Sequence, residues 1–184
     1  MKPLREAAPT MPDPITHLIV ATSLLWVFWD KKYRNYVLLL APLAVFPDLD
    51  HLVPPFHRLL LHNVFILVPT IGIALYARFR AKNEVLFNVA LIATFYLLSH
   101  LLLDLFTGAG VPLFYPLSTT TFGFTYELII AHGSLVLVPE HPALFVQSEV
   151  LGIAVTSLAL AVIIFVKNRL PFQKDVSHAA QAYG

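Results

Sequence analysis

Apolar residues are gathered into five segments of the chain, and shorter polar stretches separate them. The segments cover approximately residues 15–29, 36–46, 59–77, 85–106 and 150–166. We interpret all five as helices. Since a helix needs about 20 residues to cross about 30 Å of hydrocarbon, the fourth segment is long enough to span a membrane, and the third and fifth are close to that length. The first two are short, and Pro42 interrupts the second, so they are either tilted, kinked spans or the two arms of a re-entrant hairpin.

The composition is that of a membrane protein. Of the 184 residues, 58% are hydrophobic and 12% are charged, whereas a soluble domain has about 25% charged residues. The surplus apolar surface needs a lipid environment, so the sequence predicts an all-α, multi-pass membrane bundle of about five helices. The formal net charge of +1 is too small to support nucleic-acid binding. Because cysteine is absent, any metal ion has to be bound by histidine and carboxylate side chains.

Lysine and arginine predict the orientation of this bundle, because basic residues near the ends of spans stay on the cytoplasmic side. Nine of the twelve basic residues follow the first, third and fifth segments: Lys31, Lys32, Arg34, Arg78, Arg80, Lys82, Lys167, Arg169 and Lys174. The other three are Lys2, Arg5 and Arg58. We therefore expect a protein of the cell or inner membrane, with its amino terminus outside and its carboxyl terminus in the cytoplasm.

The segments define one domain with two terminal extensions. Residues 1–14 form an amino-terminal arm, residues 15–170 form a single membrane-embedded domain, and residues 171–184 form a cytoplasmic tail that we expect to be disordered. The domain includes a long outer connection, residues 107–148, which is rich in Gly, Pro, Thr and aromatic residues. A connection of this length usually carries a function. Its apolar stretch 128–138 predicts an interfacial helix or a pair of strands.

Histidine and aspartate gather on the predicted outer face. Seven of the eight histidines lie there: His17, His51, His57, His62, His100, His132 and His141. Asp48, Asp50 and Asp104 lie on the same face, where basic residues are nearly absent. Imidazole and carboxylate groups with few competing cations are what a divalent metal site requires.

His100 and Asp104 form the most specific local pattern. Their i, i+4 spacing places both side chains on one face of the fourth helix, where they can bind one ion together. An ionised aspartate within an apolar span costs about 2.5–3.5 kcal/mol, so Asp104 needs a compensating partner. A metal ion is one such partner, and a structural hydrogen bond with His100 is the alternative.

The second pattern is the sequence Pro-Asp-Leu-Asp-His at residues 47–51. Pro47 disfavours helix at the preceding residue, so it predicts the end of the second segment and a turn at the membrane surface. Asp48 and Asp50 lie in this turn, and two carboxylates so close repel each other unless a cation lies between them. One of them is a candidate metal ligand and the other a candidate general base. An Asx-type turn is the alternative interpretation.

A third pattern lies at residues 57–62. If this stretch is helical, His57 and His62 point about 140° apart, and His62, at the membrane edge, is the better ligand candidate. His57 and Arg58 are better placed to meet an anion, because a guanidinium offers a planar fork to phosphate or carboxylate. A snorkelling interfacial role is the alternative for Arg58. His17, at the outer start of the first helix, joins the set because the predicted topology brings it to the same face.

These residues together resemble the YdjM-like family of membrane-bound metal-dependent hydrolases, over approximately residues 17–118. The resemblance rests on His17, residues 47–51, His57-Arg58 followed by His62, His100 with Asp104, and Gly110 leading to Pro116-Leu117-Ser118. The order of the histidines and aspartates is also distantly similar to that of zinc-dependent phospholipase C. The resemblance implies that one or two metal ions are bound by His17, Asp48 or Asp50, His62, His100 and Asp104. It also makes Ser118 a candidate substrate-binding residue.

The sequence therefore predicts a membrane-embedded hydrolase of phosphoesters that uses zinc or a similar divalent ion. Arg58 would hold phosphate oxygens, and Asp48, Asp50 and His57 are the candidate catalytic residues. A site near the headgroup plane favours membrane lipid as a partner and a lipid-borne substrate. Two other classes stay open, namely an ion-handling or transport protein and a non-catalytic scaffold.

Overall fold

A computed structural model describes residues 14–53, 58–106, 110–123, 126–131, 134–139 and 148–170. Within these residues the α-helices are α1 (Pro14–Phe28), α2 (Arg34–Leu40), α3 (Val68–Phe79), α4 (Glu84–Leu105) and α5 (Ser148–Arg169). The 3-10 helices are η1 (Lys31–Tyr33), η2 (Ala41–Ala44), η3 (Phe46–Leu52) and η4 (Val64–Leu67). The strands β1 (Tyr126–Ala131) and β2 (Ser134–Pro139) form an antiparallel hairpin. The expected helical fold is confirmed, and the strand pair is one of the two alternatives predicted for residues 128–138.

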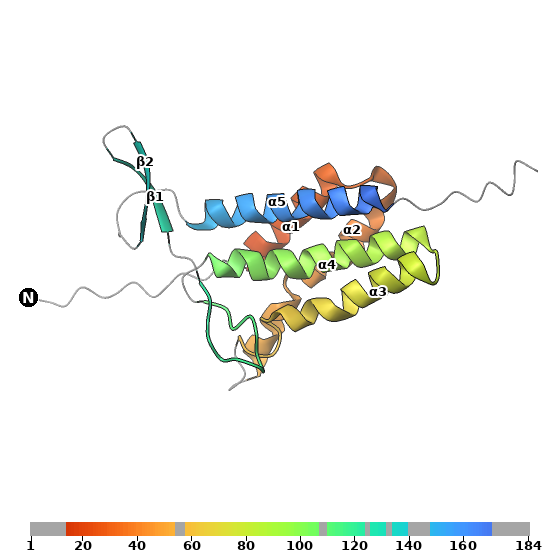
Figure 1. The fold of residues 1–184 in the computed structure, drawn as a ribbon, viewed down its shortest axis with the longest axis horizontal. Helices are drawn as coiled ribbons and strands as arrows, with labels where there is room; N and C mark the ends of the chain where they lie inside the picture. Colours follow the sequence, from red (N-terminus) through yellow and green to blue (C-terminus); the bar gives the residue numbers. More distant parts are fainter. Residues whose placement is uncertain are drawn as a thin grey trace, which may run out of the picture.

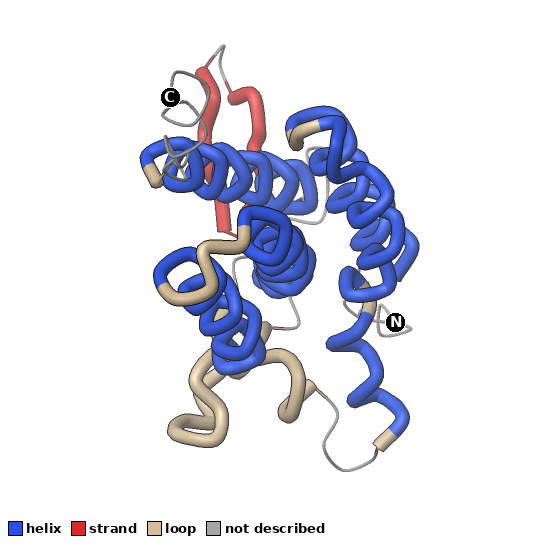
Figure 2. Tube along the Cα trace, turned by 90° about the vertical axis from the view of Figure 1, so that its right-hand side faces the viewer, coloured by secondary structure: helices blue, strands red, loops and turns tan. Residues whose placement is uncertain are grey.

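Helix α4 is the central element of the bundle. It packs against α1, α2, α3 and α5, and the end-on view in Figure 2 shows one helix enclosed by the others. Most of its apolar side chains are buried, including Ile92, Phe95 and Tyr96. The hydroxyl of Tyr96 donates a hydrogen bond of 2.8 Å to the carbonyl of Val37, which ties α4 to α2. Helix α4 therefore supplies the rigid frame on which the other elements are placed.

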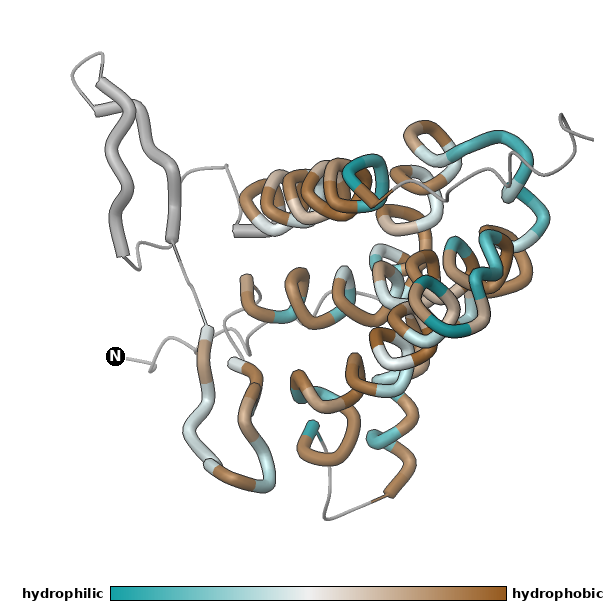
Figure 3. The backbone as a smooth tube through the Cα atoms, turned by 45° about the vertical axis from the view of Figure 1, so that its right-hand side comes forward, coloured by the Kyte–Doolittle hydropathy of each residue, from teal (hydrophilic) through white to brown (hydrophobic). Residues whose placement is uncertain are grey.

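The connections between helices lie at two opposite ends of the bundle (Figure 1). One end carries η1, the turn between α3 and α4, and the last turn of α5. Two ion pairs join these elements, Lys32 with Glu84 and Lys167 with Asp30, and Figure 3 shows that hydrophilic positions are concentrated there. The described connections that carry two or more basic residues thus lie at one end of the bundle, together with the basic last turn of α5. Asp104, in the last turn of α4, lies at the other end.

The second apolar segment is interrupted near Pro42, as its sequence indicated, and the third departs from the predicted helix at its start. Helix α2 ends at Leu40, and the chain continues as η2, in which Pro42 occupies one of the first two positions. Residues 59–63 form a turn rather than the start of a helix. The reason is local, because the side-chain amide of Asn63 donates to the carbonyls of Leu59 and Leu60 while its oxygen accepts from the amide of Phe65. This asparagine caps η4 and keeps the preceding residues out of the helix.

Two described helices are long and apolar enough to cross a membrane, namely α4 and residues 150–169 of α5. Helix α1 and the combined η4 and α3 are apolar but shorter. At 1.5 Å per residue, the 15 residues of α1 extend only about 22 Å. Helix α5 exposes a face of large apolar side chains that includes Leu158, Val162 and Phe165, and such a face requires an apolar environment.

Candidate metal centre

The 3-10 helix η3 presents three different faces, because such a helix has three residues per turn. Phe46, Leu49 and Leu52 are exposed, and Pro47 and Asp50 are buried. Asp48 and His51 share the third face and are partly buried. The predicted turn is therefore a short helix, and Pro47 at its start is compatible with it because the first turn needs no amide donor there. This geometry gives the two aspartates different surroundings.

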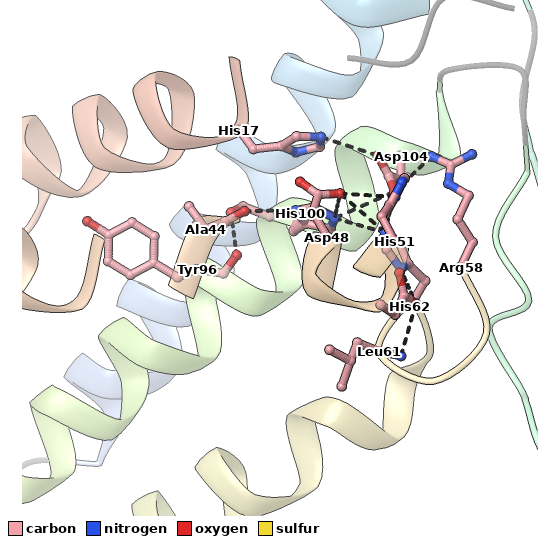
Figure 4. Close-up of polar contacts among 12 residues, drawn as sticks. His17, Ala44, Asp48, His51, Arg58, Leu61, His62, Tyr96, His100 and Asp104 are labelled. Atoms are coloured by element: carbon pink, nitrogen blue, oxygen red, sulfur yellow. Dashed lines mark hydrogen bonds and ion pairs between the residues drawn. The ribbon is translucent and has the colours of Figure 1, made fainter. Parts of the chain in front are cut away.

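Four ligand-type atoms from three elements converge at the end of α4 (Figure 4). They are Nε2 of His62, Nε2 of His100, Oδ1 of Asp48 and Oδ2 of Asp104. His62 Nε2 lies 3.2 Å from His100 Nε2, 3.2 Å from the Asp104 oxygen and 3.6 Å from the Asp48 oxygen. His100 Nε2 lies 3.5 Å from the Asp48 oxygen and 3.6 Å from the Asp104 oxygen.

These separations have the size found between neighbouring ligand atoms of a zinc ion. Zinc binds imidazole nitrogen at about 2.0–2.1 Å and carboxylate oxygen at about 2.0–2.2 Å, so neighbouring ligand atoms are roughly 3.3–3.6 Å apart. The five separations given above span 3.2 to 3.6 Å. The donor set and its spacing thus fit a divalent metal ion.

The second ring nitrogen of each histidine has its own acceptor. Nδ1 of His62 lies 2.9 Å from Oδ2 of Asp50, and Nδ1 of His100 lies 2.7 Å from the carbonyl oxygen of Ala44. When these nitrogens donate their protons, both Nε2 atoms carry lone pairs that face each other. A metal ion between them removes that repulsion, and acceptors placed behind metal-binding histidines are typical of such sites.

His17 lies beside these residues on the side of α1. We use the term cluster for seven residues that lie together here: His17, Asp48, Asp50, Arg58, His62, His100 and Asp104. His17 is 1% exposed, and its Nε2 lies 3.2 Å from Oδ1 of Asp104. Its ring stacks on that of His100, with the centroids 4.1 Å apart. Neither ring nitrogen of His17 has a hydrogen bond of satisfactory geometry among the described residues. The two oxygens of Asp104 therefore point toward different histidines, His17 on one side and His62 on the other.

Arg58 lies against the same carboxylate. Its Nη2 donates a hydrogen bond of 3.1 Å to Oδ2 of Asp104, and the residue is 9% exposed. Its Nε and Nη1 are buried and have no hydrogen-bond partner among the described residues. The backbone of Arg58 has φ +59°, a left-handed conformation that is uncommon for a residue with a side chain. This buried guanidinium therefore has donors to spare for an anion at the cluster.

The charges of the cluster favour a positive charge at its centre. Burial lowers the pKa of His62, but its hydrogen bonds with Asp104, Asp48 and Asp50 outweigh burial and raise the pKa to about 9. The centre thus attracts either a proton on His62 or a metal cation.

The structure brings together most of the residues that the sequence singled out, namely His17, Asp48, Asp50, Arg58, His62, His100 and Asp104. His57, His132 and His141 lie outside the described residues. Ser118 makes a local turn, in which its hydroxyl donates to Thr120 Oγ1 and accepts from the Thr120 amide, and its part in substrate binding stays a prediction.

Two groups at the cluster were not among the candidate ligands or catalytic residues predicted from the sequence. Nε2 of His51 lies 3.6 Å from Oδ1 of Asp48. Its i, i+3 spacing from Asp48 would have indicated this had the segment been interpreted as a 3-10 helix. The carbonyl oxygen of Ala44 accepts a hydrogen bond from Nδ1 of His100. Every residue has a backbone carbonyl, so the sequence pattern does not indicate which one will be used.

Comparison with known proteins gives one result. A family model of the YdjM inner membrane protein matches residues 11–171, and neither the curated proteins nor the solved structures gave a match. The matched region contains all five α-helices and every residue of the cluster. The chain therefore belongs to the YdjM inner membrane protein family.

Proposed function

We propose that this protein is a membrane-embedded, metal-dependent hydrolase of phosphoesters. One observation carries the proposal, namely that a four-atom metal-binding arrangement and a buried arginine with spare donors meet at a single carboxylate, Asp104. Metal-binding residues alone are compatible with storage or structure. A guanidinium fork beside them adds a binding group for phosphate oxygens.

The ligand set supports zinc as the ion. Asp48, His62 and His100 provide three protein ligands, which is the usual number for a catalytic zinc ion. Oδ2 of Asp104, which accepts a hydrogen bond from Arg58, is a fourth ligand atom, so a water molecule would bind as a fifth ligand, a number that catalytic zinc sites can reach. Oδ1 of Asp104 and Nε2 of His17, 3.2 Å apart, begin a second position, so Asp104 is suited to bridge two ions. Asp50 lies behind His62 and is better suited to orient that ring than to bind metal.

The zinc ion, Arg58 and Asp48 would each have a separate chemical role in hydrolysis. A bound zinc ion would lower the pKa of water and polarise a phosphate oxygen. Arg58 would hold non-bridging phosphate oxygens through its Nε and Nη1 groups, which have no partner among the described residues. Asp48 directs Oδ1 toward His62 and His100 while its Oδ2 is buried without a hydrogen-bond partner in the described part of the chain, so Oδ2 can accept a proton from water as a general base.

We further propose that the cluster lies at the outer face of the membrane and that the amino terminus is outside. The described basic connections share one end of the bundle, which is the end that the distribution of basic residues assigns to the cytoplasm. The cluster lies at the opposite end. Helices α1 and α2 would cross as short segments, with η2 and η3 extending the second crossing.

Ion transport is supported less well. A transport pathway needs ionisable groups along its length, and the described buried carboxylates and imidazoles are His17, Asp50, His62, His100 and Asp104, all within the cluster. The buried polar residues deeper in α4, Asn88 and Thr94, are uncharged. A polar path from one end of α4 to the other would therefore lack the groups that carry a cation.

The test is to purify the protein in detergent, remove metal with a chelator and add zinc back. Zinc content is measured beside turnover of bis(p-nitrophenyl) phosphate, a general phosphodiester substrate. We expect at least one zinc ion per chain and turnover that depends on it. Bound zinc without turnover of any phosphoester would favour ion handling, and absence of bound metal would favour a scaffold.

A further inference from the structure

Three segments pack around the end of α4 that carries the cluster, and we call them the roof. They are residues 46–53, residues 58–63 and residues 110–122. The amide of Leu61 lies 3.4 Å from Oδ2 of Asp50, and the amide of Val64 donates to the carbonyl of Leu113. The turn at residues 58–63 is therefore joined to residues 46–53, and Val64, the residue directly after the turn, is joined to residues 110–122.

The outward surface of the roof is apolar except near the end of its third segment, where Thr119, Thr120 and Thr121 are exposed. Its large exposed side chains include Leu49, Leu52, Val53, Leu60, Phe114 and Leu117, and the exposed fractions of Leu52 and Leu117 are 77% and 80%. The charged side chains among the described roof residues are Asp48, Asp50 and Arg58, and they belong to the cluster. The usual arrangement of a water-facing connection, polar outside and apolar inside, is reversed here.

The period of η3 produces this reversal. Phe46, Leu49 and Leu52 recur every three residues and form one exposed stripe, because residues three apart in a 3-10 helix lie above one another. Asp48 and Asp50 on the other faces turn toward His62 and His100. A single short helix thus separates an apolar exterior from the charged interior of the site.

The apolar surface of the roof continues along the side of the bundle. After Leu60, the exposed side chains of Phe65, Val68 and Ile71 follow on η4 and α3, and Figure 3 shows that hydrophobic positions predominate from the turn into this helix. An interface with a second copy would end at a polar border. A surface that runs on into the apolar side of a membrane helix is suited to lipid instead.

We propose that the roof is a lipid-facing surface, and that the substrate of the cluster is a membrane amphiphile whose phosphate group enters from the bilayer. The second part rests on the proposed hydrolase function. The alkyl chains of such a substrate would contact Leu52 and Leu117 while its phosphate reaches Arg58. Contact with lipid also explains how large apolar side chains remain exposed beside a charged site.

The first test measures the depth of the roof in the membrane and needs no activity. Because the chain has no cysteine, the variants Leu52→Cys and Leu117→Cys each carry one nitroxide label. The labelled protein is placed in vesicles of phosphatidylcholine with a minority of phosphatidylglycerol, and collisions with oxygen, which enters lipid, are compared with those of a water-soluble nickel complex. Leu158→Cys on α5 is the lipid control, and Lys32→Cys at the basic end is the water control.

We expect the labels at Leu52 and Leu117 to resemble the label at Leu158. Labels that collide mainly with the nickel complex would place the roof in water and overturn the proposal. Labels shielded from both reagents would indicate a protein partner, such as a second copy, and would also overturn it.

The second test concerns the substrate. Hydrolysis of a long-chain phospholipid is compared with that of the same headgroup on a short, water-soluble chain, for the wild type and for the double variant Leu52→Asn with Leu117→Asn. We expect the wild type to prefer the long chain by at least about 10-fold, which corresponds to burial of about two methylene groups, and the variant to lose this preference while it retains its zinc content.

The outcomes separate the two proposals. Equal rates on both chain lengths would refute the amphiphile while leaving the hydrolase intact. No turnover of any phosphoester by the zinc-loaded protein would refute the hydrolase and, with it, the proposed substrate. The depth measurement would still decide whether the roof faces lipid.

Discussion

Nδ1 of His62 lies 2.9 Å from Oδ2 of Asp50, and both side chains are fully buried. This contact distinguishes two aspartates that are only two residues apart in the sequence. Asp50 holds the imidazole of His62 from behind, whereas Asp48 directs Oδ1 toward the opposite nitrogen of that ring. The first prediction follows from this difference.

Replacing Asp50 by Asn should weaken zinc binding without removing the site. The neutral amide is a poorer acceptor for the ring proton of His62, and loss of such an orienting partner typically lowers metal affinity about 10- to 100-fold. Competition with a chelator measures the affinity. Asp48→Ala is the matched comparison and should lower zinc stoichiometry even when zinc is in excess. If Asp50→Asn behaves like Asp48→Ala at saturating zinc, Asp50 is a ligand and our assignment is wrong.

His100→Ala and Asp104→Ala should each remove most of the bound zinc. Each substitution deletes one corner of the four-atom arrangement and opens the site to water. Leu102→Ala is the control, because this residue lies on the same helix between them and packs against the hydrophobic core of Leu101, Leu105 and Val111. Metal analysis after gel filtration gives the answer, and full occupancy in all three variants would exclude ligation by this pair.

Arg58→Lys should preserve zinc content but lower turnover. An ammonium group cannot reproduce the planar fork of the guanidinium, and loss of a hydrogen bond to a charged group of about 1.5–3 kcal/mol corresponds to a decrease of roughly 10- to 100-fold. Steady-state kinetics with a phosphodiester, beside zinc content and melting temperature, measure this effect. An unchanged rate at full zinc occupancy would assign Arg58 a structural role at Asp104.

The stability of the protein should depend on pH in opposite ways with and without zinc. The pKa of His62 is raised from 6.5 to about 9 in the folded, metal-free protein, so its contribution to stability is complete below pH 6.5 and is lost as the pH rises through about 9. Zinc competes with the proton for His62, so stabilisation by zinc should grow over the same interval. Melting temperatures in detergent between pH 6 and about 9 measure both trends, and His62→Gln should abolish them. Parallel pH profiles with and without zinc would contradict the prediction.

The orientation can be tested in intact cells with single cysteines. A cysteine at Lys32 or Arg80 should be protected from an impermeant thiol reagent, because basic connections remain in the cytoplasm. A cysteine at Pro14, which is exposed at the start of α1, the end of that helix that carries His17, should be labelled. Labelling of Lys32→Cys in intact cells would reverse the proposed topology.

The sequence by itself determined the positions of α1, α4 and α5 and the kind of chemistry available. Long apolar runs bury their backbone groups in helices, so α1, α4 and α5 begin and end close to the residues that the pattern predicted. Local spacing also paired His100 with Asp104. These features depend on residues within one element, and a linear pattern records them.

The tertiary structure decided how these residues are used. Asn63 formed a turn where the apolar pattern predicted helix, and that turn places Arg58 and His62 beside Asp104. The division of roles between Asp48 and Asp50 arises only when η3 packs against residues 58–63. The contact between His62 and His100 joins positions 38 residues apart. Such contacts depend on how separate helices pack and which faces they turn toward each other, and no single segment of the sequence contains that information.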